Sequence, residues 1–505
     1  MSTFFAEIFK NPASIEIKEI PVIDYDEFQV RVSGLMQKED HHIVAYFPER
    51  VANGLRFFCI IADDQTSSMR IFSYLLDNMS VSVRSLTPNC PQFHCFEREL
   101  NENYGIIFEG HPWMKPVRYS AGRKGGLPEL SDYPFYEIDS EELHEVGVGP
   151  VHAGIIEPGY FRFICNGEKV LHLEIQLGYQ HRGVEELMIS GKDILQKCIL
   201  SESIAGDTAI GHCLAHSQIV ESLMDAEPSG PLMIERSIAL ELERIAIHIG
   251  DTAALCGDVA YQLGQAVCEA LRTTVINTIQ AWCGNRFGKG LIRPGGTNYP
   301  LDDSIAGSIL NLLDGTGSRY FEITDRIMSL PSVLARFEDI GRVTASQARA
   351  LGAVGMAART TGITRDIRIS HPYQFYRTLP VNIQLLEGGD VLSRCMLRIM
   401  EVKESVRYIR ELIGLWSRSE NSSKRPEYRH RLERNRLTIS LVEGWRGEIC
   451  HAAITNEKGE FTFYKIKDPS FHNWMALALA VRNQEISDFP VCNKSFNLSY
   501  CGHDL

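Results

Sequence analysis

The sequence contains 13 cysteines, yet no two of them are separated by two residues. This absence excludes a metal site built from Cys-x-x-Cys pairs. The chain also lacks a Gly-x-Gly-x-x-Gly turn after a strand, so no dinucleotide site is indicated. No Ser/His/Asp arrangement and no activated cysteine stands out. The sequence therefore does not predict a self-contained hydrolase or nucleotide-dependent enzyme.

Long apolar runs are missing as well. No stretch of 18 or more apolar residues occurs, so nothing is predicted to span a bilayer. The N-terminus, MSTFFAEIFKNPAS, lacks the basic stretch and apolar core of a secretory signal. The net charge of −13 argues against nucleic acid as a partner. Scattered cysteines without a signal favour a reducing compartment, and we expect a cytoplasmic protein, which does not exclude docking on a membrane-embedded partner.

At 505 residues, 44% of them hydrophobic, the chain is long enough for two or three domains. Residues 1–120 alternate short β-like runs with loops and predict a small α+β domain. Residues 121–145 are rich in Gly, Pro and acidic residues, which is typical of a linker. Residues 146–505 predict a larger, mainly helical domain with peripheral β-hairpins. The expected fold class is therefore α+β.

Hydrophobic periodicity gives the expected elements. Residues 56–64 and 81–86 have strand character, residues 69–78 look helical, and residues 161–178 predict a hairpin around Asn166-Gly167. Helical spacing begins beyond Gly191, where Pro231 suits the first turn of one helix. Further predictions are a helix over 383–417, strands from Leu437 with a turn at Lys458-Gly459, and a helix over 471–483.

Several motifs resemble known families. ERELNENYGIIFEGHPWM (97–114) resembles the signature of the small accessory subunit of respiratory complex I. Five later segments resemble both the quinone-reacting subunit of complex I and the large subunit of membrane-bound energy-converting [NiFe] hydrogenases, including that of formate hydrogenlyase. They are GVGPVHAG (147–154), LGYQHRGVEEL (177–187), LIRPGGTNYPLD (291–302), VEGWRGE (442–448) and KIKDPSFHNW (465–474). The chain thus resembles a fusion of the two subunits.

The resemblance implies a metal site whose ligands are lost. In the hydrogenases, two Cys-x-x-Cys pairs near the start and end of this domain hold nickel and iron. By the resemblance, Ala209 and His212 occupy the first pair of positions, and Ser499 and Gly502 occupy the second. We therefore expect no nickel–iron site and no cofactor bound by this chain, with a quinone as a candidate ligand. Cys213 and Cys501 neighbour vacated positions and leave open a site rebuilt by a one-residue shift.

The quinone pattern is incomplete. Asp258 matches an aspartate of complex I that pairs with a quinone-binding histidine; such a pair raises the proton affinity of an imidazole. The complex I loop carries two histidines: the first matches His152, whereas the second, which contacts the quinone, falls at Ile156. His152 is therefore a candidate cavity residue, and the alternative is a histidine satisfied by loop backbone. For Asp258 the alternative is a carboxylate that braces a loop.

Two further candidates follow the hydrogenase pattern. Glu157 matches the glutamate that relays protons near the metal, and a surface acid is the alternative. If Glu157 and Asp258 face one cavity, they could share a proton. His216 matches a histidine that follows the first cysteine pair. His212 lies one helical turn earlier, so both rings are expected on one helix face. A two-histidine metal site is one reading, and polar groups lining a residual water-filled pocket are the other.

The resemblance implies a subunit of a membrane-associated oxidoreductase complex that is inactive alone. Electrons would arrive from a small iron–sulfur partner subunit and pass to an acceptor near Glu157, His152, His216 and Asp258, or charge movements there would drive membrane antiporter-like subunits. The expected location is the inner face of the cell membrane, reached through partner subunits. Two alternatives remain: a [NiFe] hydrogenase or formate hydrogenlyase subunit with an atypical site, and a non-catalytic assembly scaffold.

Overall fold

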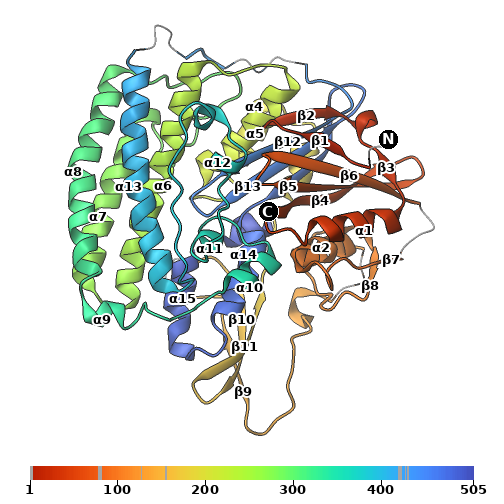
Figure 1. Ribbon diagram of the computed structural model, residues 1–505, viewed down its shortest axis with the longest axis horizontal. Helices are drawn as coiled ribbons and strands as arrows, with labels where there is room; N and C mark the ends of the chain where they lie inside the picture. The colour runs from red at the N-terminus through yellow and green to blue at the C-terminus, as the bar shows by residue number, and fades with distance from the viewer. Residues whose placement is uncertain are drawn as a thin grey trace.

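The computed structural model describes residues 4–77, 82–124, 126, 128–153, 156–418, 423–426, 428 and 431–505. The N-terminal part forms a five-stranded sheet that lies on the right in Figure 1. Its strand order is β1-β6-β5-β4, and β3 pairs in parallel with β6. The strands are β1 (Ala6–Ile8), β3 (Val22–Ile23), β4 (His41–Val51), β5 (Gly54–Asp63) and β6 (Ser68–Asp77).

Both faces of this sheet are buried. Tyr46 and Phe57 pack with Phe28 beneath helices α1 (Tyr25–Leu35) and α2 (His94–Tyr104), which cover one face. The alternate residues, such as Phe47 and Phe58, belong to the core of the rest of the protein, where the Phe47 ring stacks on Phe463 with centroids 4.7 Å apart. Because successive side chains of a strand point to opposite faces, one sheet joins two cores. A parallel pair, β7 (Ser82–Arg84) and β8 (Ile107–Glu109), lies beside α2.

The helix expected at 69–78 is wrong, because the described part of this segment, up to residue 77, lies in β6. β6 is a central strand, flanked by β5 on one side and by β1 and β3 on the other. A strand buried on both faces carries a nearly continuous apolar run, and periodicity does not separate such a run from a buried helix. The strand predicted at 56–64 is confirmed as β5, and the part of 81–86 from Ser82 contributes β7.

The helical body lies on the left in Figure 1. Pro231 sits at the first turn of α6, as predicted, and the helix predicted at 383–417 starts later, at Val391. The long helices are α5 (Ala209–Leu223), α6 (Gly230–Asp258), α7 (Gln262–Cys283), α8 (Asp303–Ile327) and α13 (Val391–Trp416). The shorter ones are α3 (Val184–Ile189), α4 (Ile194–Ser201), α9 (Pro331–Leu334), α10 (Ala345–Leu351), α11 (Met356–Arg359) and α12 (Ile367–Ser370). Among the helices described, none has the length and apolarity needed to cross a bilayer.

A four-stranded sheet in the order β14-β13-β12-β2 packs against α5. Its strands are β12 (Arg436–Glu443), β13 (Glu448–Thr455), β14 (Phe461–Lys467) and β2 (Ala13–Glu16). The predicted turn at Gly459 is confirmed, with φ +80°. β2 comes from the N-terminal end of the chain, so the region predicted as the first domain contributes a strand to the second. The predicted domain bounds stay a prediction.

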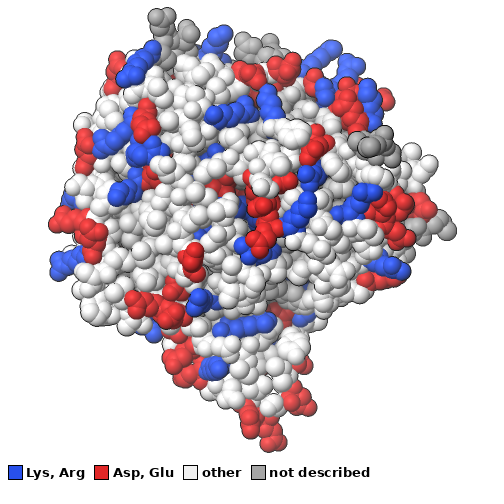
Figure 2. All heavy atoms as spheres, in the orientation of Figure 1, with Lys and Arg blue, Asp and Glu red and all other residues white. Residues whose placement is uncertain are grey.

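The remaining elements frame the middle of the molecule. The hairpin predicted at 161–178 is formed by β10 (Tyr160–Asn166) and β11 (Lys169–Gln176), with β9 (His144–Val148) alongside β10. Helices α14 (Ser470–Ala480), α15 (Phe489–Phe496) and α16 (Tyr500–Asp504) lead the chain back to the centre, where Figure 1 marks its C-terminus. The expected α+β fold is confirmed. On the face shown in Figure 2, acidic and basic side chains are interspersed rather than gathered into one basic field.

Candidate functional site

The start of α5 and the segment before α16 lie far apart in the sequence and close together in the structure. Arg446, in the loop between β12 and β13, holds both. Its guanidinium donates to both carboxylate oxygens of Asp207, at 2.6 and 2.7 Å, and to Thr208 Oγ1 at 3.2 Å. Its Nε donates to the carbonyl of Asn497. The two stretches that the resemblance pairs as metal-binding are therefore neighbours here.

Asp468 lies between these two stretches and is fully buried. Its Oδ2 is 3.1 Å from His212 Nε2 on α5, and its Oδ1 accepts from the Ser470 N–H. A Cβ added to Gly502 would lie 2.7 Å from the same Oδ2 atom. Burial alone raises the pKa of Asp468, but the hydrogen bond from His212 and the charge of Arg446 lower this pKa overall. Asp468 is therefore an ionised carboxylate that fills the space beside Gly502.

The residues present do not fit a nickel–iron group. Ala209 and Gly502 have no donor atom, and Ser499 Oγ caps α16 by accepting from the Gly502 N–H at 2.9 Å. His212 is committed to Asp468 and His451. Within the described ranges, no group of three or more His, Cys, Asp or Glu side chains is placed to hold a metal ion.

The neighbouring cysteines have different surroundings. Cys213 Sγ lies 3.3 Å from the carbonyl of Ile292, to which it donates, whereas Cys501 Sγ lies 3.5 Å from Ser499 Oγ. The geometry thus gives these two thiols separate hydrogen-bond partners.

The predicted face of α5 is formed, and both of its rings are completely buried. His216 Nδ1 lies 2.8 Å from Tyr464 Oη, and His212 Nδ1 lies 3.1 Å from His451 Nε2. Burial lowers the pKa of His216 to about 3 and that of His451 well below its ordinary value. Both rings are therefore hydrogen-bonded to side chains of β13, β14 and the residue that follows β14.

Glu157 reaches the C-terminal segment. Its Oε2 accepts from the backbone N–H groups of Tyr500 and Cys501, at 3.2 and 3.4 Å. Burial and this nearby carboxylate raise the pKa of Cys501 to about 12, so the thiol is not ionised. The structure therefore places Glu157, half-buried, beside the vacated ligand positions. Its role in proton transfer stays a prediction.

His152 and Asp258 are not brought together by a hydrogen bond. His152 Nε2 bonds to the carbonyl of Gly159 at 2.9 Å, which is the loop-backbone arrangement considered above. Asp258 is the last residue of α6 and its surface is exposed. Desolvation at this helix end raises the pKa of Asp258, which the charge of Lys494 opposes. Neither Glu157 nor His152 is a hydrogen-bond partner of Asp258 among the described residues, and the quinone role of this carboxylate stays a prediction.

Sequence reasoning missed Glu243. This fully buried carboxylate on α6 accepts from the backbone N–H groups of Ile210 and Gly211, at 2.8 and 3.2 Å, and thereby caps the start of α5. Burial raises the pKa of Glu243 to about 8, although the two N–H donors favour the ionised form. The segment ELERIAIH (241–248) contains this glutamate, but its helical periodicity identifies Glu243 only as a helix residue. Its contact with the start of α5 is visible only in the folded structure.

We expect Glu243→Gln to flatten the pH dependence of stability. A carboxyl pKa raised from 4.5 to about 8 stabilises the folded protein below pH 4.5, and this stability is lost as the pH rises through 8. The shift corresponds to roughly 4–5 kcal/mol in this buried site. Melting temperatures at pH 5.5 and 8.5 should therefore differ less in the variant than in the wild type. If the melting temperatures of the two proteins changed equally between pH 5.5 and 8.5, the raised pKa of Glu243 would be contradicted.

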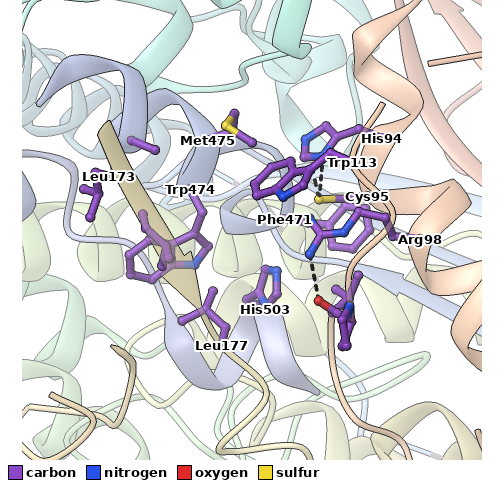
Figure 3. Close-up of a pocket in the computed structure, with 14 residues that line it drawn as sticks. His94, Cys95, Arg98, Trp113, Leu173, Leu177, Phe471, Trp474, Met475 and His503 are labelled. Atoms are coloured by element: carbon purple, nitrogen blue, oxygen red, sulfur yellow. Dashed lines mark hydrogen bonds between the residues drawn. The ribbon is translucent and has the colours of Figure 1, made fainter. Parts of the chain in front are cut away.

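Figure 3 shows a cavity that is separate from the residues described above. Asp468, His212 and Glu157 are not among its lining residues. Its lining comes from α2, β11, α14 and α16, with His94, Arg98, Trp474 and His503 among the labelled side chains. Its volume is about 50 Å³, which is room for a few water molecules and too little for an organic acceptor. Burial and the nearby charge of Arg98 lower the pKa of His94 to about 3, so this imidazole is neutral.

Two family models match the chain. Residues 32–137 match the 30-kDa subunit of the respiratory-chain NADH dehydrogenase, and residues 258–436 match its 49-kDa subunit. The second match begins at Asp258 and covers neither of the stretches at which the metal ligands would lie.

Individual proteins agree with these models. The carbon monoxide-induced hydrogenase of Rhodospirillum rubrum is 30% identical over 359 residues, which cover 70% of this chain and 97% of that protein. Formate hydrogenlyase subunit 5 of Escherichia coli is 27% identical over 440 residues, covering 82% and 76%. Among solved structures, a chain of an archaeal membrane-bound sulfane sulfur reductase shares the fold, with TM-score 0.67, 20% identity, and coverage of 73% of this chain and all of that one.

Proposed function

The chain belongs to the family of the 49-kDa and 30-kDa subunits of the respiratory-chain NADH dehydrogenase and the related hydrogenases, and from this premise we propose that it reduces an acceptor without a nickel–iron group. It is a subunit of an oxidoreductase complex of the complex I and energy-converting hydrogenase type. In the proposal, electrons arrive from an iron–sulfur partner subunit and leave on an acceptor bound near Glu157 and Cys501.

The observation that carries this proposal is the pair formed by Asp468 and His212. The carboxylate occupies the space into which a side chain at Gly502 would extend, and it bonds to the ring that stands at a vacated ligand position. The buried carboxylate and the imidazole form a hydrogen bond with each other, so neither group needs a metal ion as a partner. In the proposal, the chain keeps the electron-transfer role of the family but passes electrons to an acceptor other than a nickel–iron group.

A quinone is the acceptor that we propose first, because the matching 49-kDa family belongs to a respiratory NADH dehydrogenase. Membrane antiporter-like subunits complete the proposed complex and place this chain on the inner face of the cell membrane. The fold neighbour comes from a complex described as membrane-bound and respiratory, which supports that arrangement. Sulfane sulfur, the substrate in that neighbour's name, is the alternative acceptor to include in the assay.

The deciding experiment is elemental analysis of the intact complex, purified from its native host. We expect no nickel, iron in amounts explained by clusters of partner subunits, and no hydrogen evolution from reduced methyl viologen. Stoichiometric nickel with hydrogen evolution would overturn the proposal and favour the atypical hydrogenase.

Quinone binding separates a redox subunit from an assembly scaffold. We expect decylubiquinone to bind the intact complex and to bind at least tenfold more weakly to the Glu157→Ala variant. A complex that assembles and accepts electrons, yet binds neither decylubiquinone nor polysulfide, would favour the scaffold.

A further inference from the structure

Five buried side chains of α5, β13, β14 and the residue after it form one continuous hydrogen-bonded chain. Asp468 Oδ2 lies 3.1 Å from His212 Nε2, and His212 Nδ1 lies 3.1 Å from His451 Nε2. His451 Nδ1 lies 2.9 Å from Tyr464 Oη, which in turn lies 2.8 Å from His216 Nδ1. All five residues are at most 2% exposed.

The chemistry of the groups fixes the direction of every hydrogen bond. Ionised Asp468 only accepts, so His212 carries its proton on Nε2 and accepts on Nδ1. His451 must then donate from Nε2 and accept on Nδ1, which takes the proton of the Tyr464 hydroxyl. The Tyr464 oxygen accepts from His216 Nδ1–H. One atom is left over, His216 Nε2, which is buried and has no hydrogen-bond partner among the described residues.

This assignment requires neutral imidazoles and a protonated phenol, and burial favours these forms of His216, His451 and Tyr464. Burial lowers the pKa of His216 to about 3, with the charges of Lys197 and Arg293 acting in the same direction. The pKa of His451 is lowered well below its ordinary value, and that of Tyr464 is raised well above it. The rings of His216 and His451 can therefore exchange one neutral tautomer for the other without becoming stable cations.

We propose that this chain is a proton relay that delivers protons from His216 to Asp468, at the floor of the vacated site. A proton that binds His216 Nε2 releases the Nδ1 proton to Tyr464, which passes its own proton to His451 Nδ1. His451 passes its Nε2 proton to His212 Nδ1, and His212 passes its Nε2 proton to Asp468. One proton enters, one arrives, and the four hydrogen bonds reverse their direction.

The relay deepens the proposed function and rests on it. Reducing a quinone to a quinol consumes two electrons and two protons, and a chain of hydrogen-bonded side chains is one route that can deliver those protons to a buried site. Asp468 is suited to release them, because its Oδ2 lies against Gly502 and its charge is balanced by Arg446. After each delivery the rings and the hydroxyl group turn back to restore the starting direction.

Tyr464→Phe tests the relay by removing a single oxygen from its middle while keeping the ring. The matched control is Tyr320→Phe, which also removes a buried hydroxyl, outside the chain. The Tyr320 hydroxyl makes one hydrogen bond, to Thr252 at 2.8 Å, whereas that of Tyr464 makes two. In the intact complex, with reduced methyl viologen as donor and decylubiquinone as acceptor, we expect Tyr464→Phe to lower turnover at least tenfold. The rate of iron–sulfur cluster reduction should be unchanged, and the solvent deuterium isotope effect should increase. Wild-type turnover in Tyr464→Phe would overturn the relay.

A second measurement keeps the relay testable if the proposed acceptor is wrong. If the wild-type complex reduces no decylubiquinone, the acceptor proposal fails, and infrared spectra of the complex with ¹⁵N-labelled histidine decide about the relay. The relay requires the histidine tautomer bands to change when the complex is reduced, and requires this change to be lost in Tyr464→Phe and kept in Tyr320→Phe. Cluster reduction without any change of these bands in the wild type would overturn it.

Discussion

Replacing Arg359 with methionine is expected to lower the free energy of unfolding by about 3–5 kcal/mol, or to prevent folding outright. Arg359 is fully buried at the end of α11 and donates to Glu443 at 2.7 Å and to Glu401 at 2.5 Å. Asp366 lies 3.5 Å from the same guanidinium. Methionine keeps the volume and removes the charge, so three buried carboxylates lose a shared cation.

The matched control is Arg410→Met, the same substitution in an ion pair with Asp314 that is largely exposed. Exposed pairs contribute about 0–1 kcal/mol, so this variant should melt near the wild type. Burial already raises the pKa of Glu443 to about 7 while Arg359 acts to lower it, so the defect of Arg359→Met should shrink as the pH falls and the carboxylate takes up a proton. Thermal melts at pH 6 and 8 measure both effects. Equal stability of the two variants would contradict a structural role for the buried cation.

The main helices and the hairpin could be predicted from the sequence, because each of them depends on a local pattern of residues. Helices such as α6 and α7 have long runs of helical spacing, and the hairpin of β10 and β11 has its glycine turn. The loss of the metal ligands was also readable, since it depends on residue types at Ala209 and Gly502. β6 was mistaken for a helix because burial on both faces hides the period of a strand.

The relay could not be predicted from sequence. His212 and His216 were recognised as sharing a helix face, but their partners His451 and Tyr464 come from β13 and β14, far along the chain. Neither partner belongs to a motif, and only the packing of that sheet on α5 brings them into reach. Asp468 lies within KIKDPSFHNW, a segment valued for its resemblance alone. Side chains that act through tertiary contacts leave no periodic signal.

Replacing Gly502 with alanine should destabilise the protein by about 2–4 kcal/mol, although alanine is the better helix former by about 1 kcal/mol. The new Cβ would lie 2.7 Å from Asp468 Oδ2 and 2.8 Å from Ser499 Oγ, closer than such atoms approach. Asp468 must then move away from His212, which leaves the buried His212 Nε2–H without its partner. Overpacking and the loss of this hydrogen bond each cost about 1–3 kcal/mol. Denaturant unfolding of the variant measures the sum.

Gly307→Ala, in the second turn of α8, is the control, because nothing lies within 4 Å of its added Cβ. It should leave stability unchanged or increase it slightly. The double variant Gly502→Ala, Asp468→Ala should be more stable than the sum of its single effects predicts, since the clash disappears with the carboxylate. Additive effects would show that the methyl group is accommodated without moving Asp468. With the expected coupling, a cysteine restored at Gly502 would meet Asp468 rather than a metal, so thiols alone would not rebuild a hydrogenase site on this scaffold.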